Sequence, residues 1–183
     1  DRVVSLGAEA LPAVAASSGR ASVVLPAPVR LPFFSYNDGK GRRTKLSDSI
    51  SGRLLVLWSA SCPHCRTELS ELADSPVELP VLALCVDGRS EEARSAAQAL
   101  IVETGFTDAW GMVGGEEIEK VFLLQESLFD SAPQVAVPLS LLLNKENEVM
   151  ALYRGALDKE VLEYDRREVL RATRAQLRDL APP

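Results

Sequence analysis

Two cysteines and the chain's only histidine stand together in the motif Cys62-Pro63-His64-Cys65. A short apolar run at residues 54–58 precedes the motif, and a helical pattern follows it from Cys62 to about residue 73. Two cysteines three positions apart in a first helical turn lie on one face of the helix, close enough to form a disulfide. The motif therefore predicts thiol-disulfide chemistry at the junction of a strand and a helix.

Each residue of the motif has an expected part in this chemistry. Unpaired N–H groups and the positive end of the helix dipole stabilise a thiolate on Cys62. Pro63 costs little in the first helical turn, where a missing N–H has no partner to lose. His64 adds a donor or a positive charge beside the sulfur. A stabilised thiolate is a good leaving group, which makes the disulfide of Cys62 and Cys65 a better oxidant.

Other uses of these residues remain open at this point. A structural zinc site needs four ligands, and the soft candidates are Cys62, His64, Cys65 and Cys85. His64 is adjacent to Cys65 and fits the same tetrahedron poorly. The pair can also form an inert structural disulfide, or hold copper together with His64, because soft thiolates suit Cu(I). The favoured hypothesis is a redox-active pair, which needs no metal or cofactor, with Cys85 as an inert core residue.

The elements that must position the motif alternate between strands and helices. Apolar runs predict strands at 54–58, 81–86, 139–143 and 149–153, and helical spacing predicts helices at 62–73, 90–104, 116–129 and 158–180. Turn residues at 37–41 predict a hairpin tip, residues 46–48 a helix start, and Trp110-Gly111 a loop. The order indicates an α/β domain whose central mixed sheet is flanked by helices.

The composition narrows the class of partner and the domain layout. The chain has 183 residues, with 20 Lys and Arg against 26 Asp and Glu, so its net charge is −6 and nucleic acid is not an expected partner. No apolar run reaches the ~18 residues of a membrane span. Prolines at 12, 26, 28 and 32 predict that residues 1–28 are a linker or lead-in with at most a short edge strand. Residues 29–183 are the predicted domain, and because the chain begins with Asp1 we expect a processed or truncated form.

The run LLVLWSASCPHCRTELSEL at residues 54–72 resembles the active-site segment of thioredoxin-like proteins, especially the TlpA/ResA-like thiol-disulfide oxidoreductases. The resemblance extends upstream to residues 31–34 and 44–48, and downstream to Val137-Pro138 and the hairpin at 139–149. It covers roughly residue 29 to the C-terminus. The dipeptide Pro63-His64 is similar to that of DsbA-type oxidants instead. The resemblance implies a thioredoxin-like fold with an N-terminal extension.

The resemblance also implies roles for individual residues. Cys62 is then the exposed attacking thiol and Cys65 the buried resolving thiol. Pro138 is expected to follow a cis peptide bond, and the backbone around it, including Val137, to pair with the substrate chain. Trp58 matches the family's tryptophan under the active site.

The resemblance leaves the source of acid–base help open. Many thioredoxins carry a buried acid six residues before the first cysteine, and here that position is Val56. Such help must come from elsewhere, either water or Glu68. Glu68 fits the family's pattern of an acid three residues after the second cysteine, and a solvated charge on the helix face is the alternative.

The function implied by the resemblance is an enzyme that exchanges a Cys62–Cys65 disulfide or dithiol with cysteines of other proteins. An unidentified redox partner then restores the pair, and the implied location is extracytoplasmic, either periplasmic or secreted. The alternative function is a thioredoxin-like module that binds copper or a partner without turnover.

Overall fold

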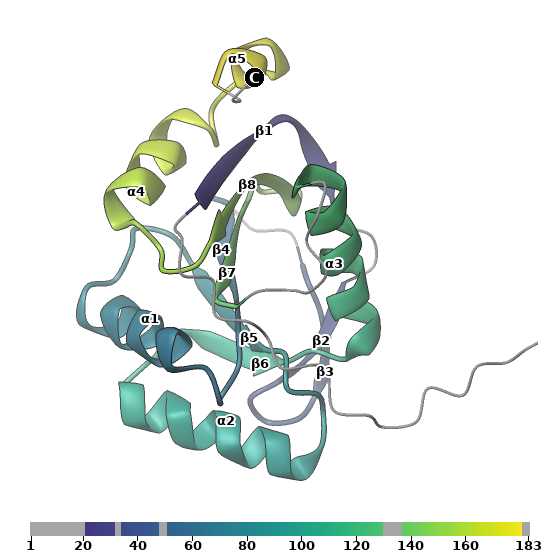
Figure 1. Cartoon of the computed structure of the whole chain (residues 1–183), viewed down its shortest axis with the longest axis vertical. Coiled ribbons are helices and arrows are strands. Elements are labelled where there is room, and N and C mark those ends of the chain that lie inside the picture. The colour runs from purple at the N-terminus through teal and green to yellow at the C-terminus, as the bar shows by residue number, and fades with distance from the viewer. Residues whose placement is uncertain (1–20, 32–33, 48–50, 130–136, 181–183) are drawn as a thin grey trace, which may run out of the picture.

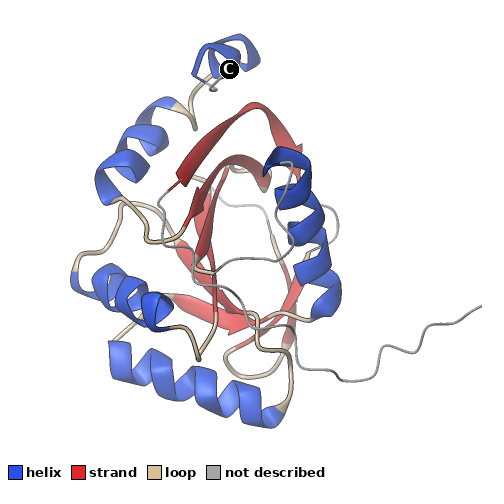
Figure 2. Cartoon of the chain, in the orientation of Figure 1, coloured by secondary structure: helices blue, strands red, loops and turns tan. Residues whose placement is uncertain are grey.

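The computed structural model of the chain describes residues 21–31, 34–47, 51–129 and 137–180 (Figure 1). Within these ranges, eight strands and five helices alternate along the chain (Figure 2). The strands are β1 (Ala21–Arg30), β2 (Ser35–Asp38), β3 (Arg43–Lys45), β4 (Arg53–Trp58), β5 (Val81–Cys85), β6 (Ala109–Met112), β7 (Leu139–Leu143) and β8 (Glu148–Arg154). The helices are α1 (Pro63–Asp74), α2 (Glu91–Thr104), α3 (Gly115–Phe129), α4 (Lys159–Glu168) and α5 (Arg174–Leu180).

All eight strands form one mixed sheet in the order β1-β8-β7-β4-β5-β6-β2-β3. The strands β4, β5 and β6 are parallel, and β7 is antiparallel to β4. The parallel strands therefore end at the edge of the sheet where β7 begins. Every residue of β5 and β7 is buried, which explains the continuous apolar runs of their sequences. The mixed sheet predicted from the sequence is confirmed.

Helices cover both faces of this sheet. The connections β4-α1-β5 and β5-α2-β6 join parallel neighbours and step in the same direction, so right-handed crossovers place α1 and α2 on one face. An ion pair between Arg66 and Glu103 joins these two helices. Figure 1 shows α3 across the sheet from α1 and α4. The central strands are thus enclosed on both sides, and only their ends reach the surface.

The N-terminal strand is longer than the short edge strand predicted from the prolines. β1 has ten residues and pairs antiparallel with β8. Its register shifts between Val24 and Val29, so Pro26 and Pro28 fall inside the irregularity, where a missing N–H interrupts no regular ladder. The predicted domain boundary after residue 28 falls within β1. Since residues 1–20 of the predicted lead-in lie outside the described ranges, the boundary itself stays a prediction.

The single C-terminal helix predicted over residues 158–180 is wrong, because the chain forms α4 and α5 instead. Between them, Thr173 and Gln176 form a capping box. The Gln176 side chain accepts the Thr173 backbone N–H at 2.9 Å, and the Thr173 hydroxyl faces the Gln176 N–H at 3.4 Å. This reciprocal arrangement starts a new helix, and its sequence signal is the Thr-x-x-Gln spacing.

The predicted loop at Trp110-Gly111 is also wrong. These residues belong to β6, which pairs parallel with β5 and antiparallel with β2. A Cβ atom on Gly111 would lie 2.3 Å from the backbone oxygen of Asn37. The close approach of β2 therefore requires glycine at this position, and a glycine in a short strand gives little strand signal in the sequence.

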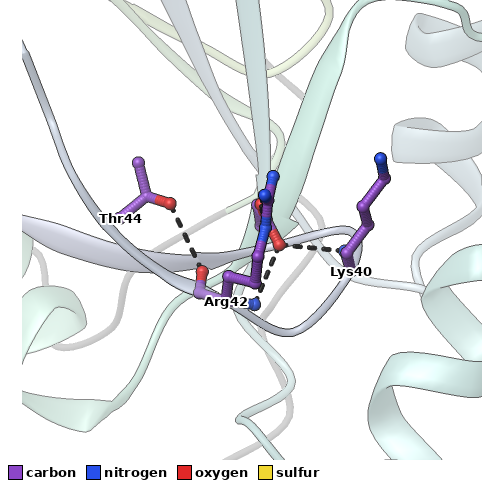
Figure 3. Close-up of polar contacts among 4 residues, drawn as sticks. Lys40, Arg42 and Thr44 are labelled. Atoms are coloured by element: carbon purple, nitrogen blue, oxygen red, sulfur yellow. Dashed lines mark hydrogen bonds and ion pairs between the residues drawn. The ribbon is translucent and has the colours of Figure 1, made fainter.

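The predicted hairpin tip at residues 37–41 is confirmed, and it joins β2 to β3. Figure 3 shows its polar contacts. The Asp38 carboxylate accepts the backbone N–H groups of Lys40 at 3.0 Å and Arg42 at 2.9 Å, and Thr44 donates to the Arg42 carbonyl at 3.3 Å. The helix start predicted at residues 46–48 is absent at Leu46 and Ser47, and its last residue lies outside the described ranges.

We predict that Gly111→Ala destabilises the fold by about 1–3 kcal/mol, the usual effect of overpacking. The added methyl group meets backbone of β2 rather than a side chain that can move. Thermal unfolding should show a lower midpoint, by about 2–4 °C per kcal/mol for a chain of this size. Gly115→Ala is the matched control, since a Cβ there meets nothing within 4 Å. Equal midpoints for the two variants would contradict the close approach of β2 and β6.

Candidate active site

The motif stands at the N-terminus of α1, where Cys62 is the N-cap residue. Its backbone is extended, with φ −93° and ψ 113°, and Pro63 is the first residue of the helix. The Cys65 backbone N–H donates a hydrogen bond to the Cys62 Sγ atom at 3.2 Å. Sulfur therefore occupies the position that a serine or aspartate oxygen takes in most helix caps. The expected placement of the motif between a buried strand and a helix is confirmed.

The loop between β4 and α1 is held by two side chains. The carbonyl oxygen of Ser59 accepts the Cys62 N–H at 3.2 Å, and the Ser59 hydroxyl accepts the Ser61 N–H at 3.2 Å. Asp87 follows β5, and one of its carboxylate oxygens accepts the Ala60 N–H at 2.8 Å. Asp87 was not predicted as a site residue from the sequence. Its available signal was an acidic residue directly after the strand that neighbours β4.

The two cysteines of the motif have unequal surroundings. Cys62 is partly exposed, whereas Cys65 is fully buried, and both are free thiols. Burial raises the pKa of the Cys65 thiol well above its ordinary value, and its hydrogen bond with Cys62 adds to this effect. The Cys65 proton is therefore held firmly in this state.

The segment before β7 reaches the same place from 75 residues further along the chain. The Cys62 thiol donates to the backbone oxygen of Val137 at 3.7 Å. Both Val137 and Pro138 are buried, and the peptide bond between them is cis, as the resemblance implied. The structure thus brings together the cysteine pair and the predicted substrate-binding segment.

Glu68 lies on the buried face of α1, one turn beyond Cys65, and is only 3% exposed. The alternative of a solvated charge on the helix face is therefore wrong. Its carboxylate accepts the Ser140 hydroxyl at 3.0 Å and the Leu157 backbone N–H at 3.3 Å. Burial outweighs these two hydrogen bonds and raises the pKa of Glu68 to about 7. The carboxylate also acts on Cys65, whose pKa its negative charge raises.

Ser140 connects Glu68 to the position where many thioredoxins carry an acid. In the sheet, Ser140 of β7 pairs with Val56 of β4. In this chain the carboxylate near that position is therefore that of Glu68, which comes from α1 and not from β4. Ser140 was not predicted from the sequence, and the signal that could have identified it is one hydroxyl inside the apolar run Leu139–Leu143.

The remaining predicted residues lie around this centre. Trp58 ends β4 with its ring fully buried, and its Nε1 has no hydrogen-bond partner among the described residues. Pro63 and His64 are exposed on the first turn of α1, and their parts in the chemistry stay predictions. Cys85 is buried in β5, as expected of a core residue, and burial raises its pKa to about 12.

The described ranges contain no group of three or more His, Cys, Asp or Glu side chains that could hold a metal ion. Among the helices of the same ranges, none combines the length and the apolar character that crossing a membrane requires.

No protein-family model matches the chain. Solved structures resemble it over most of its length. A secreted thiol-disulfide isomerase from Corynebacterium glutamicum has a TM-score of 0.60 at 18% identity, covering 90% of this chain and 96% of that one. A putative thiol:disulfide interchange protein DsbE from Chlorobium tepidum has a TM-score of 0.57 at 20% identity, covering 78% and 96%. A secreted disulfide oxidoreductase of Mycobacterium tuberculosis, homologous to DsbE of E. coli, has a TM-score of 0.54 at 13% identity, covering 73% and 94%.

At these identities the likeness concerns the fold. The predicted thioredoxin-like fold is confirmed, with its mixed sheet and flanking helices in the described part of the chain. The finer likeness to TlpA/ResA-like proteins, and that of the Pro63-His64 dipeptide to DsbA-type oxidants, stay predictions.

We predict that Glu68 makes the stability of the protein fall as the pH rises from about 4.5 to about 7. The folded state raises the pKa of this carboxyl from 4.5 to about 7, so the folded state binds the proton more tightly than the unfolded state does. The stabilisation is complete below the lower value and is lost through the upper one. Its size is about 3 kcal/mol.

Denaturant unfolding of the wild type and of Glu68→Gln over this pH range measures the contribution. The variant should lack this loss of unfolding free energy. Asp74→Asn, which removes an exposed carboxylate from the same helix, is the control and should keep the wild-type dependence. Parallel curves for the wild type and Glu68→Gln would show that the carboxyl is not held as described.

Proposed function

We propose that the chain is a protein thiol-disulfide oxidoreductase that exchanges a Cys62–Cys65 disulfide or dithiol with cysteines of other proteins. The observation that carries this proposal is the inequality of the pair. A partly exposed sulfur caps α1, and its neighbour is a fully buried thiol. An exposed thiol can meet a substrate, and a buried thiol can resolve only what its neighbour has captured. The fold shared with solved thiol-disulfide isomerases and oxidoreductases supports the same reading.

In the reducing direction, the Cys62 thiolate attacks one sulfur of a substrate disulfide. A bond between Cys62 and that sulfur forms, and the other substrate sulfur leaves as a thiolate with the bonding electrons. Cys65 then loses its proton and attacks the Cys62 sulfur. The mixed disulfide breaks, the substrate leaves with both sulfurs reduced, and the Cys62–Cys65 disulfide remains. A redox partner, still unidentified, restores the dithiol.

In the oxidising direction, a substrate thiolate attacks the Cys62 sulfur of the disulfide and Cys65 leaves as a thiolate. A second substrate thiolate then attacks the substrate sulfur of the mixed disulfide, and the substrate gains a disulfide while the pair ends reduced. In both directions the helix cap stabilises negative charge on Cys62, since the Cys65 N–H points at that sulfur.

Three further groups complete the proposed site. The backbone at Val137 and Pro138 lies beside the Cys62 sulfur and is the proposed contact for the substrate chain. Glu68 is the proposed acceptor of the Cys65 proton. Burial keeps the pKa of its carboxyl near 7, so it exchanges a proton at neutral pH. Trp58 closes the core beneath the loop that carries Cys62.

The proposed substrates are proteins, and the proposed location is extracytoplasmic. The Corynebacterium glutamicum and Mycobacterium tuberculosis proteins that share the fold are described as secreted, and oxidising compartments are where protein disulfides form and persist.

We predict that Cys62→Ser abolishes turnover in an insulin-reduction assay, because no sulfur is left to attack the substrate. Cys65→Ser should instead accumulate a covalent mixed disulfide with the substrate, seen as a mass increase that a reductant removes. Cys85→Ala, which changes the buried cysteine outside the motif, should keep turnover. Full turnover in Cys62→Ser would exclude the proposal. Stoichiometric retention of Cu(I) without exchange by the wild type would favour the alternative binding module.

We predict that His64→Ala makes the Cys62–Cys65 couple more reducing by some tens of millivolts, since each tenfold loss of thiolate stabilisation is worth about 30 mV. The group removed is the exposed imidazole of His64, two residues after Cys62 in the first turn of α1. Equilibration with glutathione buffers measures the potential. Thr67→Ala, which removes another polar side chain from the exposed surface of α1, should leave it near the wild-type value. If His64→Ala leaves the reduction potential unchanged, His64 does not contribute to it, and the helix cap alone stabilises the Cys62 thiolate.

A further inference from the structure

One hydroxyl interrupts the apolar strand β7. Its sequence is Leu-Ser-Leu-Leu-Leu, and all five residues are buried, Ser140 completely. A buried hydroxyl costs free energy unless it forms a hydrogen bond. Ser140 forms one with Glu68, at 3.0 Å between its Oγ and the carboxylate Oε1. The polar atom that breaks the apolar run is thus directed at the one carboxylate of α1 that the core contains.

The same hydrogen bond acts on the charge of Glu68. A donor aimed at a carboxylate favours the ionised form, so the Ser140 hydroxyl lowers the pKa of Glu68 against the larger opposite effect of burial. Ionised Glu68 is the form that can accept a proton. Cys65 and Glu68 lie three residues apart on the buried face of α1, and the charge of one affects the other.

We propose that Ser140 is a positioning residue that holds the Glu68 carboxylate for the Cys65 proton and so sets the pH at which the mixed disulfide is resolved; this rests on the function proposed above. In that step the proton of Cys65 passes to Glu68. The Cys65 sulfur forms a bond with the Cys62 sulfur, and the departing thiol takes the bonding electrons as a thiolate. One negative charge moves from the carboxylate to the leaving sulfur, and Ser140 stays in place throughout.

Among the groups around Glu68, Ser140 supplies the side-chain hydrogen bond to the carboxylate. On its own helix, Cys65 is its titratable neighbour, and the charge of Glu71 raises the pKa of Glu68. From β7 it meets the Ser140 hydroxyl, and from the segment after β8 it meets a backbone N–H. The ammonium of Lys159 on α4 binds the carbonyl oxygen of Ser75, past the end of α1. A side-chain substitution can remove the Ser140 hydroxyl but not the Leu157 backbone N–H, so Ser140 is the donor that a variant can test.

A two-phase reaction with dithio-bis-nitrobenzoate tests the proposal. Cys62 of the reduced protein releases one coloured thiolate when it forms the mixed disulfide, and Cys65 releases the second when it resolves it. The rate of the second release is recorded from about pH 5 to about pH 9, around the operating range of a general base with pKa near 7. Ser140→Val and Ser140→Thr are compared with the wild type. The two variants have the same shape and differ by the hydroxyl, so effects of packing cancel.

We expect the midpoint of the second phase to rise by about one pH unit in Ser140→Val, a tenfold slower resolution below the midpoint, and to stay at the wild-type value in Ser140→Thr. In a Glu68→Gln background, Ser140→Val should change the profile no further. Coincident midpoints for the valine and threonine variants, or a further shift in the double variant, would overturn the inference. Failure of the proposed function looks different, because the wild type would then show no second phase.

Discussion

A charge in a protein core must be partnered, and the active-site end of this molecule is built around one such carboxylate. Glu68 enters the core from α1 and finds a hydroxyl from β7 and a backbone N–H after β8. Glu68 and these two partners come from three different segments of the chain. The carboxylate therefore fixes how the helix that carries both cysteines lies against the sheet. Burial at the same time raises the pKa of this carboxyl to about 7, in the neutral range.

The topology explains how the other groups meet. Three parallel strands end at one edge of the sheet and an antiparallel strand begins there. The cysteine loop follows β4, Asp87 follows β5, and Val137 and Pro138 precede β7. Backbone and carboxylate contacts then lock these loops together, so the exposed sulfur is presented on a surface whose supports are rigid strands.

The sequence predicted the parts of the fold whose signal is local. Long apolar runs and helical spacing located the central strands and α1 to α3, and the cysteine spacing located the site. The errors occurred where distant chain segments decide the outcome. Gly111 lies in a strand because β2 pairs closely with it. The solvated alternative for Glu68 is wrong because Ser140 and Leu157 donate hydrogen bonds to its carboxylate inside the protein. Asp87 and Ser140 were missed for the same reason, since their importance depends on which strands are neighbours.

The sulfur cap of α1 ties local folding to chemical state. A thiolate at Cys62 is a charged acceptor for the Cys65 N–H, whereas a disulfide sulfur is a weak, neutral one. In the proposed exchange cycle, the hydrogen bond that begins the helix is therefore strong in one state of Cys62 and weak in the other. The first turn of α1 is tightest when Cys62 is ready to attack and loosest once it has bonded to another sulfur. The order of the first helical turn is thus tied to the chemical state of the Cys62 sulfur, while the fold stays the same.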